Sequence, residues 1–252
     1  MSGAVCLVYH YDKSESSSRA VADIRYCTDV ESNQRANGME TDKTSGTDAV
    51  REMYDAEAES YSTMMDSEID HPVYADTLGR LQIRIANISG PLIDAPCGSG
   101  HMLSMYHEKY DRERALIGVD LSPQMVAIAG KRLGSAADII ISDIRKLDTV
   151  QSDSAAAVIS HFAFQHLDPS GVTEALKEWH RVLKVGGQLV IGAWEGAGTI
   201  GHFSESDIVA INYDVDALTT MIRENGFSIS KSFVETDEEM KMDAVYIEGV
   251  KE

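Results

Sequence analysis

The sequence predicts an α/β fold in which helices cover both faces of a parallel sheet. Short apolar runs alternate with helical stretches through the middle of the chain, and this alternation is typical of parallel sheets. The run 91–95 leads into a turn that contains Gly98 and Gly100, and the run 115–119 ends at Asp120. A glycine turn at a strand end lets backbone amides and a helix N-terminus approach a ligand closely. The pattern indicates a site for a nucleoside-bearing cofactor.

The first 46 residues lack the apolar periodicity of a folded domain. They carry scattered charges and a serine-rich stretch over 14–18, so apolar burial does not offset the entropy of ordering them. We therefore expect a disordered N-terminal tail over 1–46 and one folded domain over 47–252. A chain of 252 residues with 43% hydrophobic content can bury one substantial core.

Two helices are expected at the start of this domain. Apolar side chains recur there in two groups, each with the spacing of one helical face. The first group is Val50, Tyr54, Ala58 and Tyr61, and the second is Tyr74, Leu78, Leu81 and Ile85. We expect the two helices to cap the sheet that follows.

Five strands and three helices are expected to alternate in the centre of the domain. The strands are predicted at 91–95, 115–119, 137–141, 155–160 and 187–193. Helices are predicted to begin at His101, near Pro169, and at Ser122, a good N-cap that is followed by a proline. The pair Gly186-Gly187 is predicted to stop the third helix and turn the chain into the fifth strand.

The C-terminal part is predicted to add an antiparallel hairpin to the sheet. An irregular stretch runs to Asp214, a helix follows over 215–225, and Gly226 stops it. Strands are expected over 227–234 and 244–250, and the acidic loop between them is short enough for a hairpin. The complete sheet then has seven strands.

The composition argues against nucleic acid as a partner. The chain has 41 acidic and 22 basic residues, and its formal net charge of −19 repels a phosphate backbone. We expect a solvated acidic surface, with attraction of cations as the alternative. The cysteines Cys6, Cys27 and Cys97 are too few and too scattered for a disulfide framework or a metal site. Cys97 is interpreted as a small apolar filler and not as a reactive thiol.

The sequence also predicts a cytoplasmic protein with no membrane partner. No apolar stretch reaches the roughly 18 residues that are needed to span a bilayer. The opening run over 4–9 lacks a preceding basic segment and is too short for the apolar core of a signal peptide.

The segment Asp94-Ala95-Pro96-Cys97-Gly98-Ser99-Gly100 resembles the first motif of the class I, Rossmann-like methyltransferases that depend on S-adenosylmethionine (SAM). Pro96 departs from that motif, which most often has a glycine there, and a proline removes a hydrogen-bond donor. Leu103 stands where a dinucleotide fingerprint needs a small residue, which disfavours a nicotinamide oxidoreductase. The resemblance covers about residues 50–250. It implies a Rossmann-like sheet that is closed by the C-terminal hairpin, and SAM as the cofactor.

The resemblance implies cofactor contacts at the ends of the second and third strands. Asp120 would accept hydrogen bonds from the ribose hydroxyls, with Leu121 and Met125 beside the adenine. Asp143 would accept from the adenine amino group, and Ile144 would lie against the ring. A helix-capping role for Asp120 and an ordinary loop role for Asp143 are the alternatives.

The methionine end of the cofactor is expected at the first strand. Asp94 and the amides around Gly98 and Gly100 would face its ammonium group and the ribose, and Tyr61 would lie near its carboxylate, unless Tyr61 is a core residue. The complete set of predicted cofactor residues is Tyr61, Asp94, Ala95, Gly98, Gly100, Asp120, Leu121, Met125, Asp143, Ile144, Ser160 and His161.

The loop after the fourth strand is where the resemblance places the reacting groups. It contains His161 and His166, the two candidate general bases, because an imidazole can take a proton from a hydroxyl, thiol or ammonium near neutral pH. A capping or packing role for either histidine stays open, since methyl transfer also proceeds by proximity and desolvation alone.

The acceptor is expected to be a small molecule with a nitrogen, oxygen or sulfur nucleophile. The strand end Ser160-His161-Phe162-Ala163 differs from the Asn/Asp-Pro-Pro-aromatic segment usual in enzymes that methylate DNA amino groups or protein glutamine, and no large insertion offers a target-recognition domain. The candidate pocket residues are Tyr54, Met65, Trp194, Glu195, His202 and Tyr213. The alternative function is a catalytically silent domain that binds SAM and acts as a regulator or partner subunit.

Overall fold

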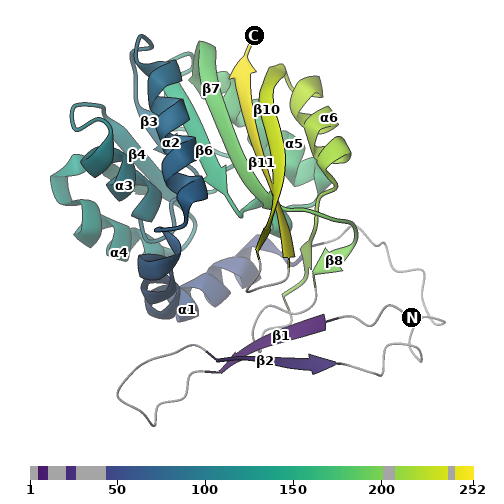
Figure 1. Cartoon of the computed structure of the whole chain (residues 1–252). Coiled ribbons are helices and arrows are strands. Elements are labelled where there is room, and N and C mark those ends of the chain that lie inside the picture. Colours follow the sequence, from purple (N-terminus) through teal and green to yellow (C-terminus); the bar gives the residue numbers. More distant parts are fainter. Residues whose placement is uncertain (1–4, 11–20, 27–43, 201–207, 238–241) are drawn as a thin grey trace.

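The computed structural model describes residues 5–10, 21–26, 44–200, 208–237 and 242–252 (Figure 1). Its centre is a sheet of seven strands in the order β10-β11-β7-β6-β3-β4-β5. Strands β3 to β7 run parallel, and β11 is antiparallel to both β7 and β10. This is the Rossmann-like sheet with a C-terminal antiparallel hairpin that the sequence predicts.

The strands of the sheet agree with the predicted ranges to within a few residues. They are β3 (Leu92–Asp94), β4 (Leu116–Asp120), β5 (Asp138–Ile141), β6 (Ala155–His161), β7 (Leu183–Trp194), β10 (Phe227–Asp237) and β11 (Met242–Lys251). In the stretch expected to be irregular, the short strands β8 (Thr199–Ile200) and β9 (Ala210–Ile211) pair antiparallel.

Helices cover both faces of the sheet because successive strand residues point to opposite faces. In β3, for example, Leu92 packs into one hydrophobic core and Ile93 into the other. Helices α2 (Pro72–Ile85), α3 (His101–Lys109) and α4 (Pro123–Leu133) cover the first core. Helices α5 (Pro169–Val182) and α6 (Val215–Glu224) cover the second core, together with the short 3-10 helix η2 (Phe164–His166).

The helix starts follow the capping residues of the sequence. The Ser122 hydroxyl accepts a hydrogen bond from the Met125 amide at 3.1 Å, and Pro123 is the first helical residue of α4. Asp168 caps α5 in the same way, with an oxygen 2.7 Å from the Gly171 amide. These contacts satisfy amides that have no partner inside the helix, so each helix begins where the sequence predicts.

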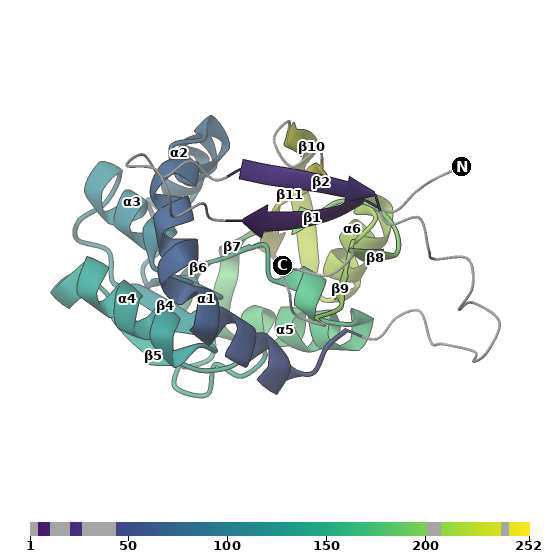
Figure 2. The same ribbon diagram turned by 90° about the horizontal axis from the view of Figure 1, so that it is seen from below.

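Helix α1 (Thr47–Glu68) lies across the end of the sheet where the parallel strands terminate, as Figures 1 and 2 show from two sides. It packs against α4, and α2 follows after a short turn. The two predicted N-terminal helices are therefore present. Because the loops that carry ligands in α/β sheets lie at the carboxyl ends of the strands, α1 covers the edge where a site is expected.

Two strands, β1 (Val5–His10) and β2 (Val21–Tyr26), precede α1 in the chain. They lie in the segment expected to be a disordered tail, and they pair antiparallel with each other in a sheet of their own. A strand pair needs only a few β-forming residues on each side, so the missing longer periodicity did not exclude it. The division of the chain into a tail over 1–46 and one folded domain over 47–252 stays a prediction.

The glycine pair Gly186-Gly187 does not stop helix α5, contrary to the sequence-based expectation. The helix ends four residues earlier, at Val182, and β7 begins at once with Leu183. The pairing register with β6 shifts across the glycines, where Gly186 has a φ of 79°. The pair therefore forms an irregularity inside a long strand, and the helix ends without it.

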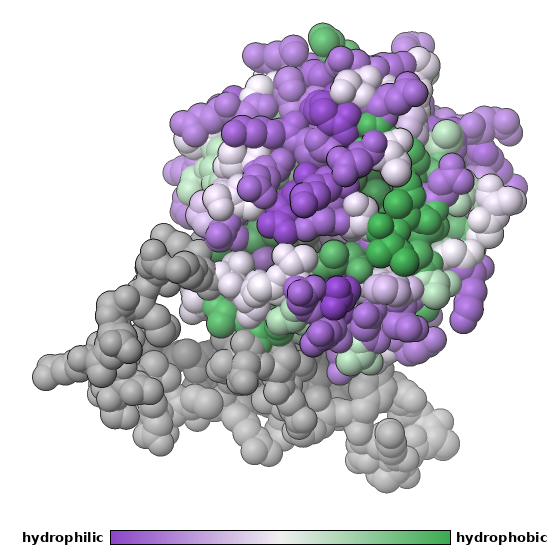
Figure 3. Space-filling view, turned by 180° about the vertical axis from the view of Figure 1, so that it is seen from behind, coloured by the Kyte–Doolittle hydropathy of each residue, from purple (hydrophilic) through white to green (hydrophobic). Residues whose placement is uncertain are grey.

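The surface is mostly hydrophilic on the face shown in Figure 3, with an apolar patch at one side. This agrees with a sequence in which 25% of the residues are charged. Among the helices in the described ranges, none is both long enough and apolar enough to cross a membrane.

The buried Glu248 provides a test of how α2 is held on the sheet. Its side chain is 5% exposed and pairs with Arg80 Nε at 2.6 Å and with a terminal guanidinium nitrogen of Arg84 at 3.0 Å. Glu248→Gln should lower the free energy of unfolding by about 1–3 kcal/mol, since it leaves charged donors without a charged acceptor. Denaturant unfolding measures the change.

The matched control is Asp48→Asn, which removes a pair on the surface of α1. Asp48 is 84% exposed and lies 3.0 Å from Arg51. This variant should lose less than about 1 kcal/mol. Equal losses for the two variants would show that the Glu248 cluster does not hold α2.

Candidate active site

A cavity opens beneath α1 at the carboxyl-terminal edge of the sheet. Its volume is about 770 Å³, the open mouth included. The structure brings ten residues proposed from the sequence together on its walls. They are Tyr54, Tyr61, Gly98, Asp120, Leu121, Met125, Asp143, Ile144, His161 and His166. Segments that lie far apart in the chain meet here because the parallel strands all end at this edge.

The turn after β3 is tied to the end of β4 by Asp120. One carboxylate oxygen accepts a hydrogen bond from the Gly98 amide at 2.8 Å, and the other accepts from the Ser122 amide at 2.9 Å. Gly98 has a φ of 50°, and a Cβ at this position would lie 3.2 Å from the Tyr61 ring. Two features therefore favour glycine here: the positive φ of the backbone and the small space left by the Tyr61 ring.

Two buried carboxyl groups lie at these neighbouring strand ends. Burial raises the pKa of Asp94 well above its ordinary value, and the charge of Asp120 adds to the effect. Burial also raises the pKa of Asp120, although hydrogen bonds from the Ser122 and Gly98 amides oppose the shift. Buried neighbouring carboxylates favour a positively charged ligand, which would relieve both effects.

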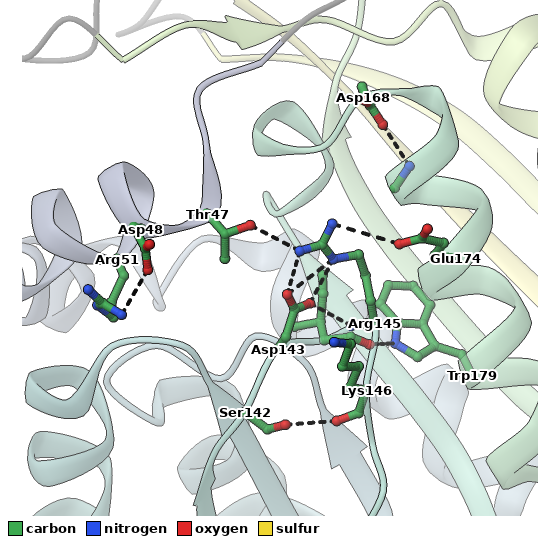
Figure 4. A network of polar contacts seen from close by, with 12 residues as sticks. Thr47, Asp48, Arg51, Ser142, Asp143, Arg145, Lys146, Asp168, Glu174 and Trp179 are labelled. Atoms are coloured by element: carbon green, nitrogen blue, oxygen red, sulfur yellow. Dashed lines mark hydrogen bonds and ion pairs between the residues drawn. The ribbon is translucent and has the colours of Figure 1, made fainter.

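The third strand end carries a polar network around Asp143, which Figure 4 shows. Arg145 Nε lies 2.9 and 3.1 Å from the two oxygens of Asp143. A terminal nitrogen of Arg145 lies 3.0 Å from the hydroxyl of Thr47, the first residue of α1. Burial works to raise the pKa of Asp143, but the hydrogen bonds from Arg145 hold it below its ordinary value. The network fixes this carboxylate in its charged form and links it to α1.

His166 makes a direct contact with α1. Its Nε2 lies 2.9 Å from the Tyr54 hydroxyl, and the two rings meet edge to face at 5.4 Å. Burial lowers the pKa of His166 to about 4, so the imidazole is neutral at neutral pH. Burial and the charge of Asp120 raise the pKa of Tyr54, so its phenol keeps its proton. This contact gives His166 a structural role in holding α1.

His161 differs from His166 in its surroundings. Burial lowers its pKa to about 4 as well. Both ring nitrogens are buried, and neither has a hydrogen-bond partner among the described residues. The two candidate bases are thus no longer equivalent, because only His166 is engaged with α1.

Further polar contacts hold α1 along its length. The Ser122 hydroxyl donates to Asp55 at 2.5 Å, and Asp66 accepts from Arg132 at 2.9 Å. His101 Nε2 lies 2.8 Å from the same Asp66 oxygen. Helix α1 is therefore bound to both ends of α4 and to the first turn of α3 as well as to the strand-end loops.

Four other predicted cofactor residues are buried next to the lining in the chain. Asp94 and Ala95 precede the lining residue Pro96, Gly100 follows Gly98 by two positions, and Ser160 precedes His161. All four are buried.

Of the predicted pocket residues that the structure describes, Tyr54 alone lines the cavity. The Trp194 ring packs 4.5 Å behind Phe162, and the Tyr213 hydroxyl donates to the Leu167 carbonyl at 2.6 Å. Both therefore support the wall from behind. Glu195 forms a β-bridge with Tyr213. Met65 lies one helical turn beyond Tyr61 on α1 and is outside the lining, whereas His202 lies outside the described residues.

Seven lining residues were not proposed from the sequence. They are Thr47, Val50, Pro96, Arg145, Phe162, Ala163 and Leu167. Phe162, Ala163 and Leu167 belong to the loop that the resemblance placed at the site, so their segment was identified and their individual roles were not. Arg145 gave no local signal, because its importance comes from pairing with Asp143 and Thr47.

Residues 92–187 match a family model described as a methyltransferase domain. This segment is similar in sequence to methyltransferase domains. The match spans β3 to the first part of β7, and so contains Asp94, the glycine turn, Asp120, Asp143 and both histidines. SAM is the cofactor of this family, and methyltransferases of the same fold have been solved with SAM or its demethylated product bound. None of the curated proteins compared with the sequence matches it.

Solved structures share the fold at low sequence identity. The 1,6-didemethyltoxoflavin-N1-methyltransferase of Burkholderia thailandensis, with bound 1,6-didemethyltoxoflavin and S-adenosylhomocysteine, is 16% identical with a TM-score of 0.62 and covers 81% of this chain and 88% of its own. The magnesium protoporphyrin IX methyltransferase of Synechocystis PCC 6803, with bound SAM, is 14% identical with a TM-score of 0.62. The match covers 82% of this chain and 97% of that enzyme. The [4+2]-cyclase SpnF is 17% identical with a TM-score of 0.54, and the match covers 68% of this chain and 80% of the cyclase.

The buried His166 predicts a pH-dependent stability. Between pH 6.5 and 4 the unfolded chain binds a proton at this histidine that the folded chain does not bind, so unfolding becomes easier as the pH falls. In His166→Asn the free energy of unfolding should fall less steeply over this range, by about 1 kcal/mol per pH unit. Denaturant unfolding at a series of pH values measures the two slopes.

Tyr54→Phe is the matched control for this prediction. It removes the hydrogen bond to His166 but keeps the histidine buried, and burial is the cause of the lowered pKa. Its slope should therefore equal that of the unmodified chain. If His166→Asn leaves the slope unchanged, the histidine is not buried as a neutral group.

Proposed function

We propose that this chain transfers the methyl group of SAM to a small-molecule acceptor, and that residues 47–252 form the catalytic domain. The observation that carries the proposal is the pair of buried carboxyl groups, Asp94 and Asp120, beside the glycine turn at the edge of an open cavity. SAM, when bound, supplies an electrophilic methyl group on a sulfonium. The chain's own residues orient the two reactants and exclude water from them.

The charge of this carboxyl pair supports SAM over a dinucleotide. Each buried carboxylate is stabilised by a positive charge nearby. SAM carries an ammonium group and a sulfonium, whereas a dinucleotide carries a pyrophosphate that Asp94 and Asp120 repel. Leu103 is fully buried in α3, and it occupies the position where a dinucleotide fingerprint needs a small residue.

The carboxylates of Asp120 and Asp143 can also accept hydrogen bonds from the ribose and the adenine. Both oxygens of Asp120 accept a backbone amide, but each has a second lone pair for a ribose hydroxyl. Leu121 and Met125 offer apolar walls for the adenine, and Ile144 lies in the same lining. Asp143 keeps lone pairs for the adenine amino group while it is paired with Arg145.

The remaining part of the cavity supports a small acceptor. Its walls include Val50, Tyr54, Phe162 and Leu167, and α1 covers it. The net charge of −19 opposes a nucleic acid. The toxoflavin and protoporphyrin enzymes of the same fold are methyltransferases of small molecules, which adds support.

A second candidate function is a domain that binds SAM without methylating anything. The [4+2]-cyclase SpnF shares the fold, so this fold also serves a protein that is named for another reaction. Methyl transfer separates the two candidates, and cofactor binding does not.

The proposal is tested by calorimetric titration with SAM, S-adenosylhomocysteine and NAD, followed by methyl transfer from radiolabelled SAM to amines, thiols, carboxylic acids and phenols. We expect binding of the first two ligands, no binding of NAD, and transfer to at least one acceptor. Binding without transfer to any acceptor would favour the silent domain. No binding of SAM or its product would refute both functions.

The cofactor site itself is tested by Asp120→Ala. The variant should bind S-adenosylhomocysteine at least about tenfold more weakly, because a hydrogen bond to a charged group contributes about 1.5–3 kcal/mol. Calorimetry gives the affinity, and thermal unfolding reports any loss of the glycine turn. Asp138→Ala, at the exposed opposite end of the neighbouring strand β5, is the control and should keep the original affinity. Equal affinities for the two variants would refute the assignment of Asp120.

A further inference from the structure

His161 occupies a niche that the strand beside it leaves open. It is the last residue of β6 and lies opposite Gly192 of β7. A Cβ on Gly192 would come within 2.7 Å of the His161 ring, so glycine makes room for the imidazole. The ring lies 5.9 Å from that of Tyr74 and 6.2 Å from that of Tyr246, and it lines the cavity. The histidine is thus held between aromatic rings at the cavity wall.

This placement leaves the polar atoms of His161 unsatisfied. Neither ring nitrogen has a hydrogen-bond partner among the described residues, and both are buried. An unpaired buried polar group is unfavourable, and most such groups in folded proteins have a partner. A neutral imidazole offers one donor and one acceptor. The niche therefore favours a ligand that brings a matching polar group.

The residue after His161 is strained, which separates this strand end from an ordinary packing site. Phe162 has a φ of 53°, a conformation that an aromatic residue rarely adopts. Its amide donates to the Gly192 carbonyl at 2.7 Å, and its ring packs on Trp194. Backbone strain of this kind concentrates at functional sites. Here the strained residue is aromatic and lines the cavity next to His161.

The positive charge of the cavity lining is already paired. Arg145 is the one lysine or arginine among the described lining residues, and it is paired with Asp143. Tyr54 and His166 contact each other. An anionic acceptor would meet no available cation in the described lining, and Asp120 would repel it. An uncharged acceptor avoids both penalties.

We propose that the acceptor is an uncharged, planar molecule whose O–H or N–H group donates a hydrogen bond to His161, and that His161 is a catalytic base. This inference rests on the proposed methyltransferase function. The lone pair of the acceptor oxygen or nitrogen forms the new bond to the methyl carbon, and the carbon–sulfur bond breaks with its electron pair left on sulfur. The proton of the acceptor passes to the free nitrogen of His161 and then to water. The neutral ring of His161 has one nitrogen with a lone pair, and that nitrogen is the atom that takes the proton.

The acceptor class is tested with a panel of probes and radiolabelled SAM. The panel contains 2-naphthol and indole as planar hydroxyl and N–H donors, 2-naphthoate as a planar anion, and cyclohexanol and cyclohexylamine as non-planar acceptors. We expect transfer to a planar, uncharged member and none to 2-naphthoate. Preferred methylation of the anion or of the non-planar probes would overturn the inference but leave the methyltransferase function standing. Binding of SAM with no transfer to any probe would also overturn it.

The role of His161 is tested by two substitutions at the same position. His161→Phe removes both polar atoms, so KM for the planar acceptor should rise at least about tenfold and kcat should fall. His161→Gln keeps an acceptor oxygen but no base, so KM should stay within about threefold while kcat falls about a hundredfold. Affinity for S-adenosylhomocysteine, measured by calorimetry, should change by less than about threefold in both variants.

His107→Gln is the matched control, because this histidine lies on α3 away from the cavity lining. It should keep both kinetic constants. If His161→Gln retains kcat within about threefold, His161 is not the base. If either variant fails to fold, Gly192→Ala tests the same niche from β7, and an unchanged kcat in that variant would likewise overturn the proposal.

Discussion

The site depends most on the hydrogen bonds that Asp120 makes to two backbone amides. They join the glycine turn after β3, the end of β4 and the start of α4. A carboxylate at this point stabilises amides that would otherwise lack partners at a turn and at a helix N-terminus. It also places a negative charge beside Asp94, and the buried pair then favours a cationic ligand. One side chain thus fixes both the geometry and the electrostatics of the candidate cofactor site.

The cover over the cavity depends on the polar contacts of α1. The helix carries few buried side chains, and it is held by contacts such as Tyr54 to His166, Asp55 to Ser122, and Asp66 to Arg132. These contacts join α1 to η2 and to both ends of α4. A cover that is bound by several separate polar contacts can open locally at lower free energy than one bound by a continuous apolar core. This property suits a helix above a site that, under the proposed function, admits two reactants.

Much of the fold could be predicted because its signals are local. Apolar runs, the Ser122 cap and the glycine turn each specify a strand, a helix start or a tight bend within a few residues. The error at Gly186 has a local cause too, since a glycine pair stops a helix in one context and forms a strand irregularity in another. The sequence analysis predicted no strands over Val5–His10 and Val21–Tyr26, because it interpreted the scattered charges and the serine-rich stretch as signs of a disordered tail.

The sequence by itself determined the order of the elements, the sheet class and the strand ends that carry acidic residues, because these follow from periodicity and turn chemistry along the chain. Only the tertiary structure decided which side chains share a partner. Tyr54 and His166 are 112 positions apart, and Thr47 and Arg145 are 98 apart, so no local pattern links them. The difference between His161 and His166 arises in the same way. Burial, available space beside a glycine and the identity of neighbouring rings depend on how distant segments pack, and a linear pattern does not contain that information.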